Sequence, residues 1–313
     1  MASEFELIDR YFRKDAPSAL LGVGDDCALL KVDGTLAVST DMLVSGTHFF
    51  PEDDPHLLGR KSLAVNLSDM AAMGARPKWA TLALALPAAD ESWLKAFSRG
   101  FLEIASEYGV DLVGGDTTRG PLAICVQIMG EVQHPMRRDG ARVGDDIWVS
   151  GTLGDAALGL SHLLGKIDLE EDAKHCLACL RNPVPRVELG LALSGISRCA
   201  IDISDGFCAD LSHVLEASKV SAQVHLQDLP ASCVLEKFRN RPEGVRAMLS
   251  GGDDYELCFT SPEEKREDVE KIGSGLGIRL TRVGKIICGS GLVLLDEDGM
   301  PMEAREKGYD HFR

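Results

Sequence analysis

Aspartates recur in this sequence at the ends of apolar runs and inside one apolar segment, where a carboxylate is unusual. They stand in six places, which are Asp25 with Asp26, Asp41, Asp69, Asp116, Asp202 with Asp205, and Asp253 with Asp254. Taken singly, each is best interpreted as an ordinary turn, cap or solvated residue. Together, most of them beside Gly, Ser or Thr, they indicate a shared cation. Carboxylate oxygens supplemented by the hydroxyls of Ser39 and Thr40 suit Mg²⁺ better than Zn²⁺, which prefers His and Cys.

A glycine pair precedes one of these aspartates, in the stretch VDLVGGDTTRGPL (110–122). Its apolar start predicts a buried strand, and the residues from 114 onward predict a glycine-rich turn. Gly114 and Gly115 would let the main chain approach a phosphate and offer N–H donors to it. Asp116 would then bind the Mg²⁺ that phosphates commonly accompany. Arg119 could pair with a phosphate oxygen, and a plain surface arginine is an equal alternative.

The usual nucleotide and phosphatase motifs do not fit. GLSHLLGKI (159–167) has one residue too many between its glycines for a P-loop, and Ile167 follows Lys166 where Ser or Thr should hold the metal. LLKVDGTLAV (29–38) places Lys31 where a haloacid-dehalogenase-type phosphatase needs its nucleophilic aspartate. No G-x-S-x-G segment indicates acyl transfer.

The chain has 313 residues, 45% of them hydrophobic, and a formal net charge of −16. This charge argues against nucleic acids and anionic membranes as partners, because both attract cationic surfaces. The N-terminal residues lack a basic segment followed by an apolar one, and the apolar window 80–87 is too short to span a bilayer. We therefore expect a cytoplasmic protein without a nucleic-acid or membrane partner. Nine scattered cysteines fit reduced thiols rather than a disulfide framework.

Two further segments are interpreted as structural. Cys176 and Cys179 form a C-x-x-C in HCLACL (175–180), which has no second pair and is helix-like, so a structural role is favoured over a metal or redox site. The glycine turn SGTLGDAALGL (150–160) opens a helix-like segment, and a strand–turn–helix form explains its glycines better than a phosphate cradle does.

Strand-like apolar runs alternate with helix-like segments, which predicts an α/β protein. Strands are expected at 34–40, 122–132 and 146–151, and helices at 56–74 and 92–109. The polar stretch QHPMRRDGARVGDD (133–146) is the best candidate boundary. Beyond this stretch the alternation resumes as a second αβ unit. We therefore predict two α/β domains, at residues 1–136 and 137–313.

An ordered set of motifs runs from near the start of the chain to near its end. The motifs are GVGDDCALL, STDMLVSGTHF, NLSDMAAMGARP, LVGGDTTRGPL, RRDGARVGDDIWVSGTLGDAALGL, IDISDGFCADL, GGDDYELCFT and GYDHF. This set resembles the thiamine-monophosphate kinase family, within the aminoimidazole-ribonucleotide synthetase-like superfamily of ATP-binding enzymes. The resemblance implies a mixed α/β (α+β) two-domain fold with ATP between the domains. It also implies that the N-terminal domain binds ATP and metal, and that its sheet contributes to a barrel in a homodimer.

Carried over position by position, the resemblance implies three sets of site residues. The magnesium ligands are Asp26, Ser39, Thr40, Asp41, Asp69, Asp116, Asp202 and Asp205, of which Asp41, Asp69 and Asp116 are the catalytic ones. The ATP contacts are Gly115, Asp116, Arg138 and Ser204. The substrate contacts are His48, Asp253 and Tyr309. The family commonly has Glu at 253 and Trp at 309, so this chain carries a shorter carboxylate and a smaller ring there.

The implied reaction transfers a phosphoryl group from ATP, as co-substrate, to thiamine monophosphate and gives thiamine diphosphate and ADP. A phosphomonoester loses its second proton near a pKa of about 6, so the acceptor needs no general base at neutral pH. Several Mg²⁺ ions would screen the two polyanions and align them for direct in-line transfer. The rivals are a selenophosphate-synthetase-like or aminoimidazole-ribonucleotide-synthetase-like enzyme, and a non-catalytic acidic metal-binding protein.

Overall fold

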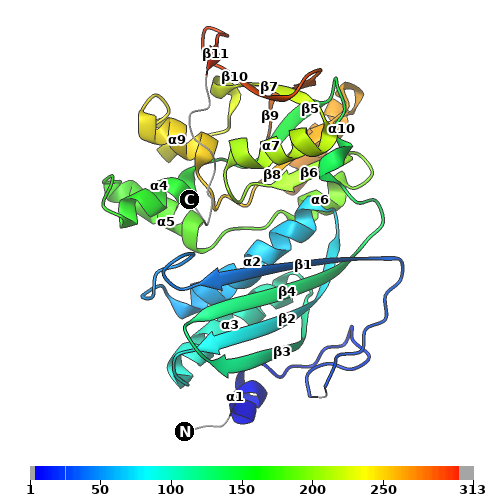
Figure 1. Cartoon of the computed structure of the whole chain (residues 1–313), viewed down its shortest axis with the longest axis vertical. Coiled ribbons are helices and arrows are strands. Elements are labelled where there is room, and N and C mark those ends of the chain that lie inside the picture. Colours follow the sequence, from blue (N-terminus) through cyan, green and yellow to red (C-terminus); the bar gives the residue numbers. More distant parts are fainter. Residues whose placement is uncertain (1–3, 25, 303–313) are drawn as a thin grey trace. The chain divides into compact units, whose positions relative to one another are not determined.

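The structure is a computed structural model, and it describes residues 4–24 and 26–302 (Figure 1). By its internal contacts the chain divides into two compact units. The first comprises Met1–Met70 and Ala75–Gln133, and the second comprises Ala71–Gly74 and His134–Arg313. The functional domains at 1–136 and 137–313 stay a prediction. Within the described part of the chain, no helix has both the length and the apolar character needed to cross a membrane.

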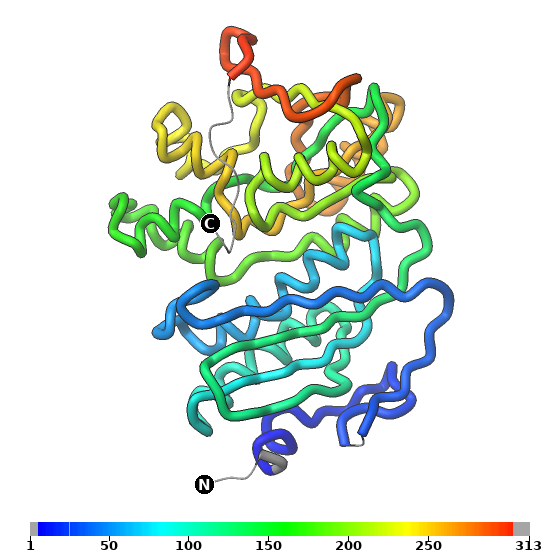
Figure 2. The backbone as a smooth tube through the Cα atoms, viewed as in Figure 1, coloured from blue at the N-terminus to red at the C-terminus, as the bar shows by residue number. Residues whose placement is uncertain are grey.

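A four-stranded sheet forms the centre of the first unit. Its strands are β1 (Thr35–Val44), β2 (Arg76–Leu86), β3 (Asp111–Arg119) and β4 (Ala123–Val132), in the spatial order β1-β4-β2-β3. β4 is antiparallel to both of its neighbours, and β2 and β3 are parallel. The helices are α1 (Glu4–Tyr11), α2 (Pro55–Ala72) and α3 (Glu91–Glu107), and α2 and α3 lie on one face of the sheet (Figure 1). A long loop leads from α1 to β1 (Figure 2).

The sheet is apolar on the face that the helices cover and exposed on the other. In β2, Leu82 and Leu84 are buried, whereas Ala83 between them is exposed. A strand with one covered face requires this alternation, because successive side chains point to opposite sides. β1 departs from it by exposing large apolar side chains, with Val38 52% and Met42 56% exposed. The open face of β1 is therefore an unusually apolar surface.

α2 and α3 pack closely because each contributes a glycine to their contact. A Cβ at Gly100 of α3 would lie 1.9 Å from the main-chain oxygen of His56. One at Gly59 of α2 would lie 2.1 Å from that of Phe97. Real Cβ atoms essentially never come that close, so the two backbones meet without side chains between them.

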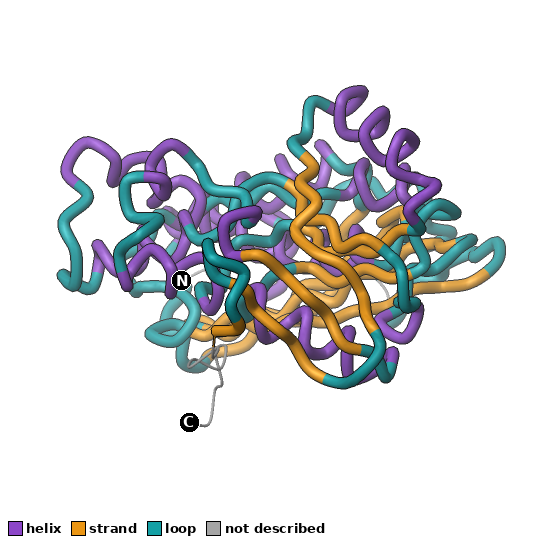
Figure 3. Tube along the Cα trace, turned by 90° about the horizontal axis from the view of Figure 1, so that it is seen from above, coloured by secondary structure: helices purple, strands orange, loops and turns teal. Residues whose placement is uncertain are grey.

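A seven-stranded sheet forms the second unit, in the order β11-β10-β7-β9-β5-β8-β6. Its strands are β5 (Asp146–Ser150), β6 (Cys199–Asp202), β7 (Ser221–His225), β8 (Leu257–Ser261), β9 (Leu280–Ile287), β10 (Gly291–Leu295) and β11 (Pro301–Met302). Its helices are α4 (Asp155–Leu163), α5 (Ala173–Arg181), α6 (Val187–Leu193), α7 (Phe207–Ser218), α8 (Cys233–Glu236), α9 (Pro242–Ser250) and α10 (Arg266–Leu276). Figure 3 shows how strands, helices and loops alternate along the chain. Ile147 and Ile201 of the sheet form the core with Phe207 and Leu211 of α7.

The elements expected from the sequence are confirmed, with one error. The strands expected at 34–40, 122–132 and 146–151 correspond to β1, β4 and β5, and the helices correspond to α2 and α3. The glycine-rich turn expected from residue 114 is wrong, because residues 114–119 continue β3 and pair in register with residues 81–86 of β2. A neighbouring strand that supplies ladder hydrogen bonds overrides the weak strand preference of glycine.

We expect Gly100→Ala to lower the free energy of unfolding by about 2–3 kcal/mol, because an added Cβ cannot fit without separating α2 from α3. Gly275→Ala in α10 is the matched control, since a Cβ there meets nothing within 4 Å. That change should stabilise the protein by about 0.5 kcal/mol through the better helix propensity of alanine. Urea titration of both variants measures the two effects, and equal stabilities would contradict the close packing.

Candidate active site

β1 presents the predicted ligands of the first unit on alternating faces. Ser39 and Asp41 share a face, while Thr40 between them points the other way. The Ser39 hydroxyl donates to Oδ2 of Asp69 on α2 at 2.5 Å, so the shared face is the one that the helices cover. Ser39 and Asp69 are thus brought together, with Asp41 next along the same face. A half-buried carboxylate such as Asp69 needs a partner of this kind, because an unpaired charge away from water is costly.

Gly115 and Asp116 lie on β3, which is the other edge strand of the sheet. A Cβ at Gly115 would lie 1.9 Å from the main-chain oxygen of Leu82, and the residue has φ +154°, so only glycine fits here. The carboxylate of Asp116 is exposed. Across the intervening strands, the register aligns Asp116 with Met42, the residue after Asp41.

Asp41 and Asp116 of one chain are too far apart to bind the same ion. Their strands are the two edges of the sheet, with β4 and β2 between them. At about 4.8 Å per strand, the two main chains are about 14 Å apart. Two oxygens on one Mg²⁺ are at most about 4.2 Å apart. A single chain therefore offers two separate ligand positions in this unit, one at Asp41 and Asp69 and one at Asp116.

Two further predicted residues of the first unit flank β1. Asp26 is exposed and lies in the loop before the strand. The N–H of Leu29 donates to the oxygen of Leu21 at 2.9 Å and closes this loop. His48 follows the strand, and its Nδ1 atom accepts the N–H of Val44 at 2.9 Å. This contact places the proton of the neutral ring on Nε2 and holds the imidazole in one orientation.

In the second unit, two loops that are distant in the sequence lie side by side. β6 ends at Asp202, which is 5% exposed, and Ser204 and Asp205 follow it. The N–H of Asp253 donates to the oxygen of Ser204 at 2.9 Å and so extends the antiparallel pairing of β6 with β8 past the strand ends. Asp202, Ser204, Asp205 and Asp253, which the sequence assigned to metal, nucleotide and substrate, are therefore neighbours.

Asp210 organises this loop, and sequence reasoning missed it. Its Oδ2 atom accepts three main-chain N–H groups, those of Ser204, Asp205 and Gly206, each at 3.1 Å. Burial, and then the nearby charge of Asp205, raises the pKa of the Asp210 carboxyl to about 7. The available signal was an aspartate in the first turn of an apolar helix. Asp210 is a positioning residue, because it fixes the loop that carries Ser204 and Asp205.

The side chains of the adjacent Asp253 and Asp254 accept hydrogen bonds from different partners. Asp253 has a left-handed main chain, with φ +68°, and its Oδ1 accepts the hydroxyl of Tyr255 at 3.0 Å. Both carboxylate oxygens of Asp254 accept the N–H of Gly154, at 3.0 and 2.9 Å, at the start of α4. The Asp254 side chain therefore accepts a main-chain N–H of the 150–160 turn that a phosphate would otherwise need. This agrees with the structural interpretation of that turn.

The buried Glu256 and the partly exposed Arg186 form an ion pair that the sequence did not reveal. Arg186 donates from Nε to Oε2 of Glu256 at 2.7 Å and from its Nη2 to Oε1. The hydroxyl of Ser150 also donates to Glu256. A glutamate within the strand-like run YELCFTS was the only sign of this contact in the sequence. The pair anchors the main chain that follows Asp253.

One predicted ATP contact, Arg138, does not lie beside Asp202, Ser204, Asp205 and Asp253. The main-chain oxygen of Arg138, in the short helix Arg138–Gly140, accepts the hydroxyl of Ser218 at 2.7 Å and the thiol of Cys199 at 3.7 Å. Cys199 begins β6 and Ser218 ends α7, so Arg138 lies at the opposite end of both elements from Ser204. Its role as an ATP contact stays a prediction. Tyr309 lies outside the described residues.

The predicted ligands have the right chemistry for Mg²⁺, because carboxylates and hydroxyls supply the hard oxygen donors it prefers. Their convergence is partial. Among residues 4–24 and 26–302, the one group of three His, Cys, Asp or Glu side chains with ligand atoms within 4.8 Å of one another lies elsewhere, on α4 and α5. The ligand roles of the aspartates stay predictions.

Comparison with known proteins covers nearly the whole chain. Residues 24–132 match the N-terminal domain of AIR synthase related proteins, and residues 142–297 match their C-terminal domain. The chain is 45% identical over 318 residues to the thiamine-monophosphate kinase of Salmonella typhimurium, covering 99% of this chain and 98% of that protein. The chain belongs to the thiamine-monophosphate kinase family.

Solved structures of thiamine-monophosphate kinases share its fold. The enzyme from Stenotrophomonas maltophilia superposes with a TM-score of 0.84 at 45% identity, over 91% of this chain and 93% of that one. A structure described as AaThiL complexed with AMPPCP and TMP gives a TM-score of 0.79 at 32% identity, over 88% of this chain and 87% of that one. The mixed α/β two-domain fold implied by the resemblance is therefore confirmed.

We expect Asp210→Asn to change how stability depends on pH. The pKa of Asp210 is about 7 in the folded protein, against about 3.9 in an unfolded chain. Between these values the folded state keeps a proton that the unfolded state has lost. The free energy of unfolding of the wild type therefore falls as the pH rises from about 4 to about 7, by up to about 1.4 kcal/mol per unit. Asparagine does not titrate, so the variant lacks this loss.

Melting temperatures in magnesium-free buffer between pH 5 and pH 8 measure the effect. The wild type should lose stability relative to Asp210→Asn as the pH rises. Asp228→Asn, at an exposed position, is the control and should follow the wild type. Parallel curves for the wild type and Asp210→Asn would show that the carboxyl of Asp210 is ionised throughout.

Proposed function

We propose that this protein transfers the γ-phosphoryl group of ATP to thiamine monophosphate and releases thiamine diphosphate and ADP. The observation that supports this most strongly is the match of almost the whole chain to thiamine-monophosphate kinases. The structure described as AaThiL complexed with AMPPCP and TMP adds to it, because AMPPCP is an ATP analogue. A relative of this chain thus holds a nucleotide and a second phosphate compound together.

The proposed transfer is direct and in line, because the acceptor brings its own nucleophile. A phosphomonoester is mostly deprotonated at neutral pH, so no side chain has to remove a proton. The site fits this, since its predicted residues are chiefly carboxylates and hydroxyls suited to holding cations. Mg²⁺ bound there would screen the repulsion between the two anions. Asp41 and Asp69 would hold the cation on one side of the transferred group and Asp116 the cation on the nucleotide.

The resemblance also assigns Asp202, Ser204 and Asp205 to this reaction. In-line transfer depends on fixed positions of donor and acceptor, so a loose loop would cost rate. The three amide bonds to Asp210 hold this loop in one conformation. The hydrogen bond from the Asp253 N–H to the Ser204 oxygen links the predicted nucleotide contact, Ser204, to the predicted substrate contact, Asp253.

We also propose a homodimer in which two first-unit sheets join edge to edge. β1 is a ten-residue edge strand with exposed Val38 and Met42, and long edges with apolar faces are normally covered. In a closed ring of two such sheets, β1 of one protomer lies beside β3 of its partner. The strand that carries Asp116 in the second copy would then lie beside the strand that carries Asp41, whereas two other strands separate these strands within one chain. A complete site would need both protomers.

A cytoplasmic location is part of this proposal. All nine cysteines are free thiols, which is typical of a reducing compartment.

Incubation with ATP, Mg²⁺ and thiamine monophosphate tests the reaction, and we expect equal amounts of ADP and thiamine diphosphate. Asp69→Asn should lower turnover at limiting Mg²⁺ by at least about a hundredfold, because it weakens a metal ligand. Its melting temperature should stay close to that of the wild type, since the asparagine oxygen can still accept the Ser39 hydroxyl. Glu52→Gln, in an exposed turn, is the control and should keep full activity.

Release of ADP without thiamine diphosphate would overturn the proposed reaction. Thiamine and aminoimidazole precursors, offered as alternative acceptors, identify the rival activities. Normal activity of Asp69→Asn at limiting Mg²⁺ would remove that residue from the ligand set while leaving the reaction itself in place.

Mixed dimers of Asp41→Asn and Asp116→Asn test whether the site is shared between protomers. Each variant alone should be inactive. In a mixed dimer, one of the two sites combines the intact Asp41 of one protomer with the intact Asp116 of the other. Because about half of the dimers are mixed and each has one intact site, co-expression should restore about a quarter of the wild-type activity.

The matched control combines Asp41→Asn with Asp69→Asn. These two residues lie on the same side of one protomer, so no mixed dimer has an intact site and no activity should return. Failure of Asp41→Asn and Asp116→Asn to complement each other would show that the shared site is wrong.

A further inference from the structure

A cluster of side chains on α4 and α5 lies outside all the residues assigned above. α4 and α5 pack against each other, and Gly159 allows a close approach, since a Cβ there would lie 2.6 Å from the main-chain oxygen of Cys176. This contact brings the first residue of α4, Asp155, against α5. His175 and Cys179 are one helical turn apart on α5 and therefore share a face.

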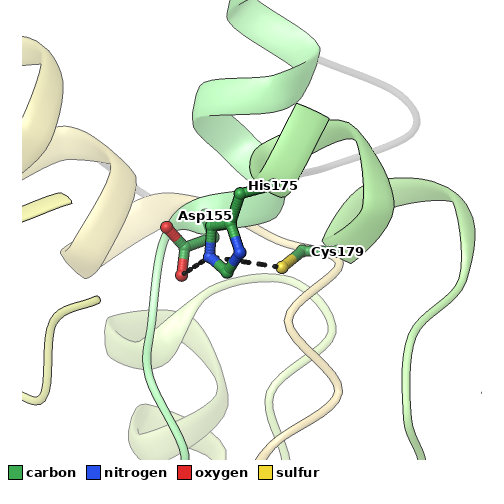
Figure 4. A group of neighbouring side chains, drawn as sticks. All are labelled: Asp155, His175 and Cys179. Atoms are coloured by element: carbon green, nitrogen blue, oxygen red, sulfur yellow. Dashed lines mark hydrogen bonds and ion pairs between the residues drawn. The ribbon is translucent and has the colours of Figure 1, made fainter. Parts of the chain in front are cut away.

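Three chemically different ligand atoms meet there. The Nε2 atom of His175 is 3.3 Å from Oδ2 of Asp155 and 3.8 Å from the sulfur of Cys179 (Figure 4). The ligand atoms of all three residues lie within 4.8 Å of one another. In a tetrahedral zinc site with bonds of about 2.0–2.3 Å, ligand atoms are about 3.3–3.8 Å apart. The two separations measured from His175 match those of a formed site.

The carboxylate of this cluster is held in place by other side chains. The side chain of Asp155 is 3% exposed. Its Oδ1 accepts the hydroxyl of Ser232 at 2.6 Å, and its Oδ2 accepts that of Thr152 at 3.1 Å. Partners behind a metal ligand orient it in this way. The imidazole of His175 is 50% exposed, so an ion can reach the cluster from solvent.

We propose that Asp155, His175 and Cys179 bind one zinc ion, with a water molecule as the fourth ligand. The imidazole and the thiolate favour zinc over magnesium, so this ion differs from those of the phosphoryl-transfer site. It would fasten the start of α4 to α5. The proposal does not depend on the proposed function, because none of these residues was assigned to ATP, substrate or Mg²⁺.

The C-x-x-C pair of the sequence is not the ligand pair. Cys176 is fully buried, and its sulfur lies 3.9 Å from the other oxygen of Asp155, Oδ1. It does not belong to the group whose ligand atoms meet. The ligand pattern on α5 is instead H-x-x-x-C, completed by a carboxylate from a different helix.

Cobalt substitution tests the site, because a thiolate bound to Co²⁺ gives a charge-transfer band in the near ultraviolet. The full chain is stripped with a chelator under reducing conditions, and its oxygen sites are filled with Mg²⁺ before Co²⁺ is added. We expect the band to saturate at about one equivalent of Co²⁺ and to disappear when Zn²⁺ displaces it. Cys179→Ser should abolish the band, and His175→Ala should weaken binding at least about tenfold.

Two matched variants exclude other thiols and the C-x-x-C alternative. Cys233→Ser changes an exposed cysteine on α8, and Cys176→Ser changes the buried neighbour. Both should keep the band. Zn²⁺ should also raise the melting temperature of the wild type but not of Cys179→Ser. Absence of a band in the wild type, or a band that survives Cys179→Ser, would overturn the proposal and leave the cluster as a set of hydrogen bonds.

Discussion

A carboxylate that is buried away from water needs hydrogen-bond donors or a cation beside it. The positions of the predicted site residues depend on these contacts. Asp210 is compensated in part by three main-chain N–H groups, and burial still raises its pKa to about 7. Glu256 is compensated by Arg186, and Asp69 by the hydroxyl of Ser39. An acidic group left without such a partner would cost more than one hydrogen bond returns. Each compensating contact also fixes a segment that carries a predicted ligand, so charge compensation and site positioning rely on the same bonds.

Features that depend on local periodicity could be predicted from the sequence. The β-branched run before Asp41 and the apolar helix around Asp69 place both residues correctly on β1 and α2. These inferences succeed because strand and helix patterns repeat every few residues.

Features that depend on long-range pairing could not be predicted in this way. Nothing local shows that β4 and β2 lie between β1 and β3, and that order alone separates Asp41 from Asp116. The same holds for the cluster on α4 and α5, where the C-x-x-C drew attention to Cys176 and away from His175. A ligand that comes from another helix has no characteristic sequence spacing from the other ligands, so no motif reveals it.

The left-handed main chain at Asp253 suits the aspartate found here, where the family resemblance implies a glutamate. Aspartate enters this region more readily than most residues with a longer side chain, because its short carboxylate can bond locally. Here that bond comes from the hydroxyl of Tyr255, two residues further on. The replacement therefore shortens the reach of the carboxylate by one methylene group and lowers the strain in the backbone that carries it.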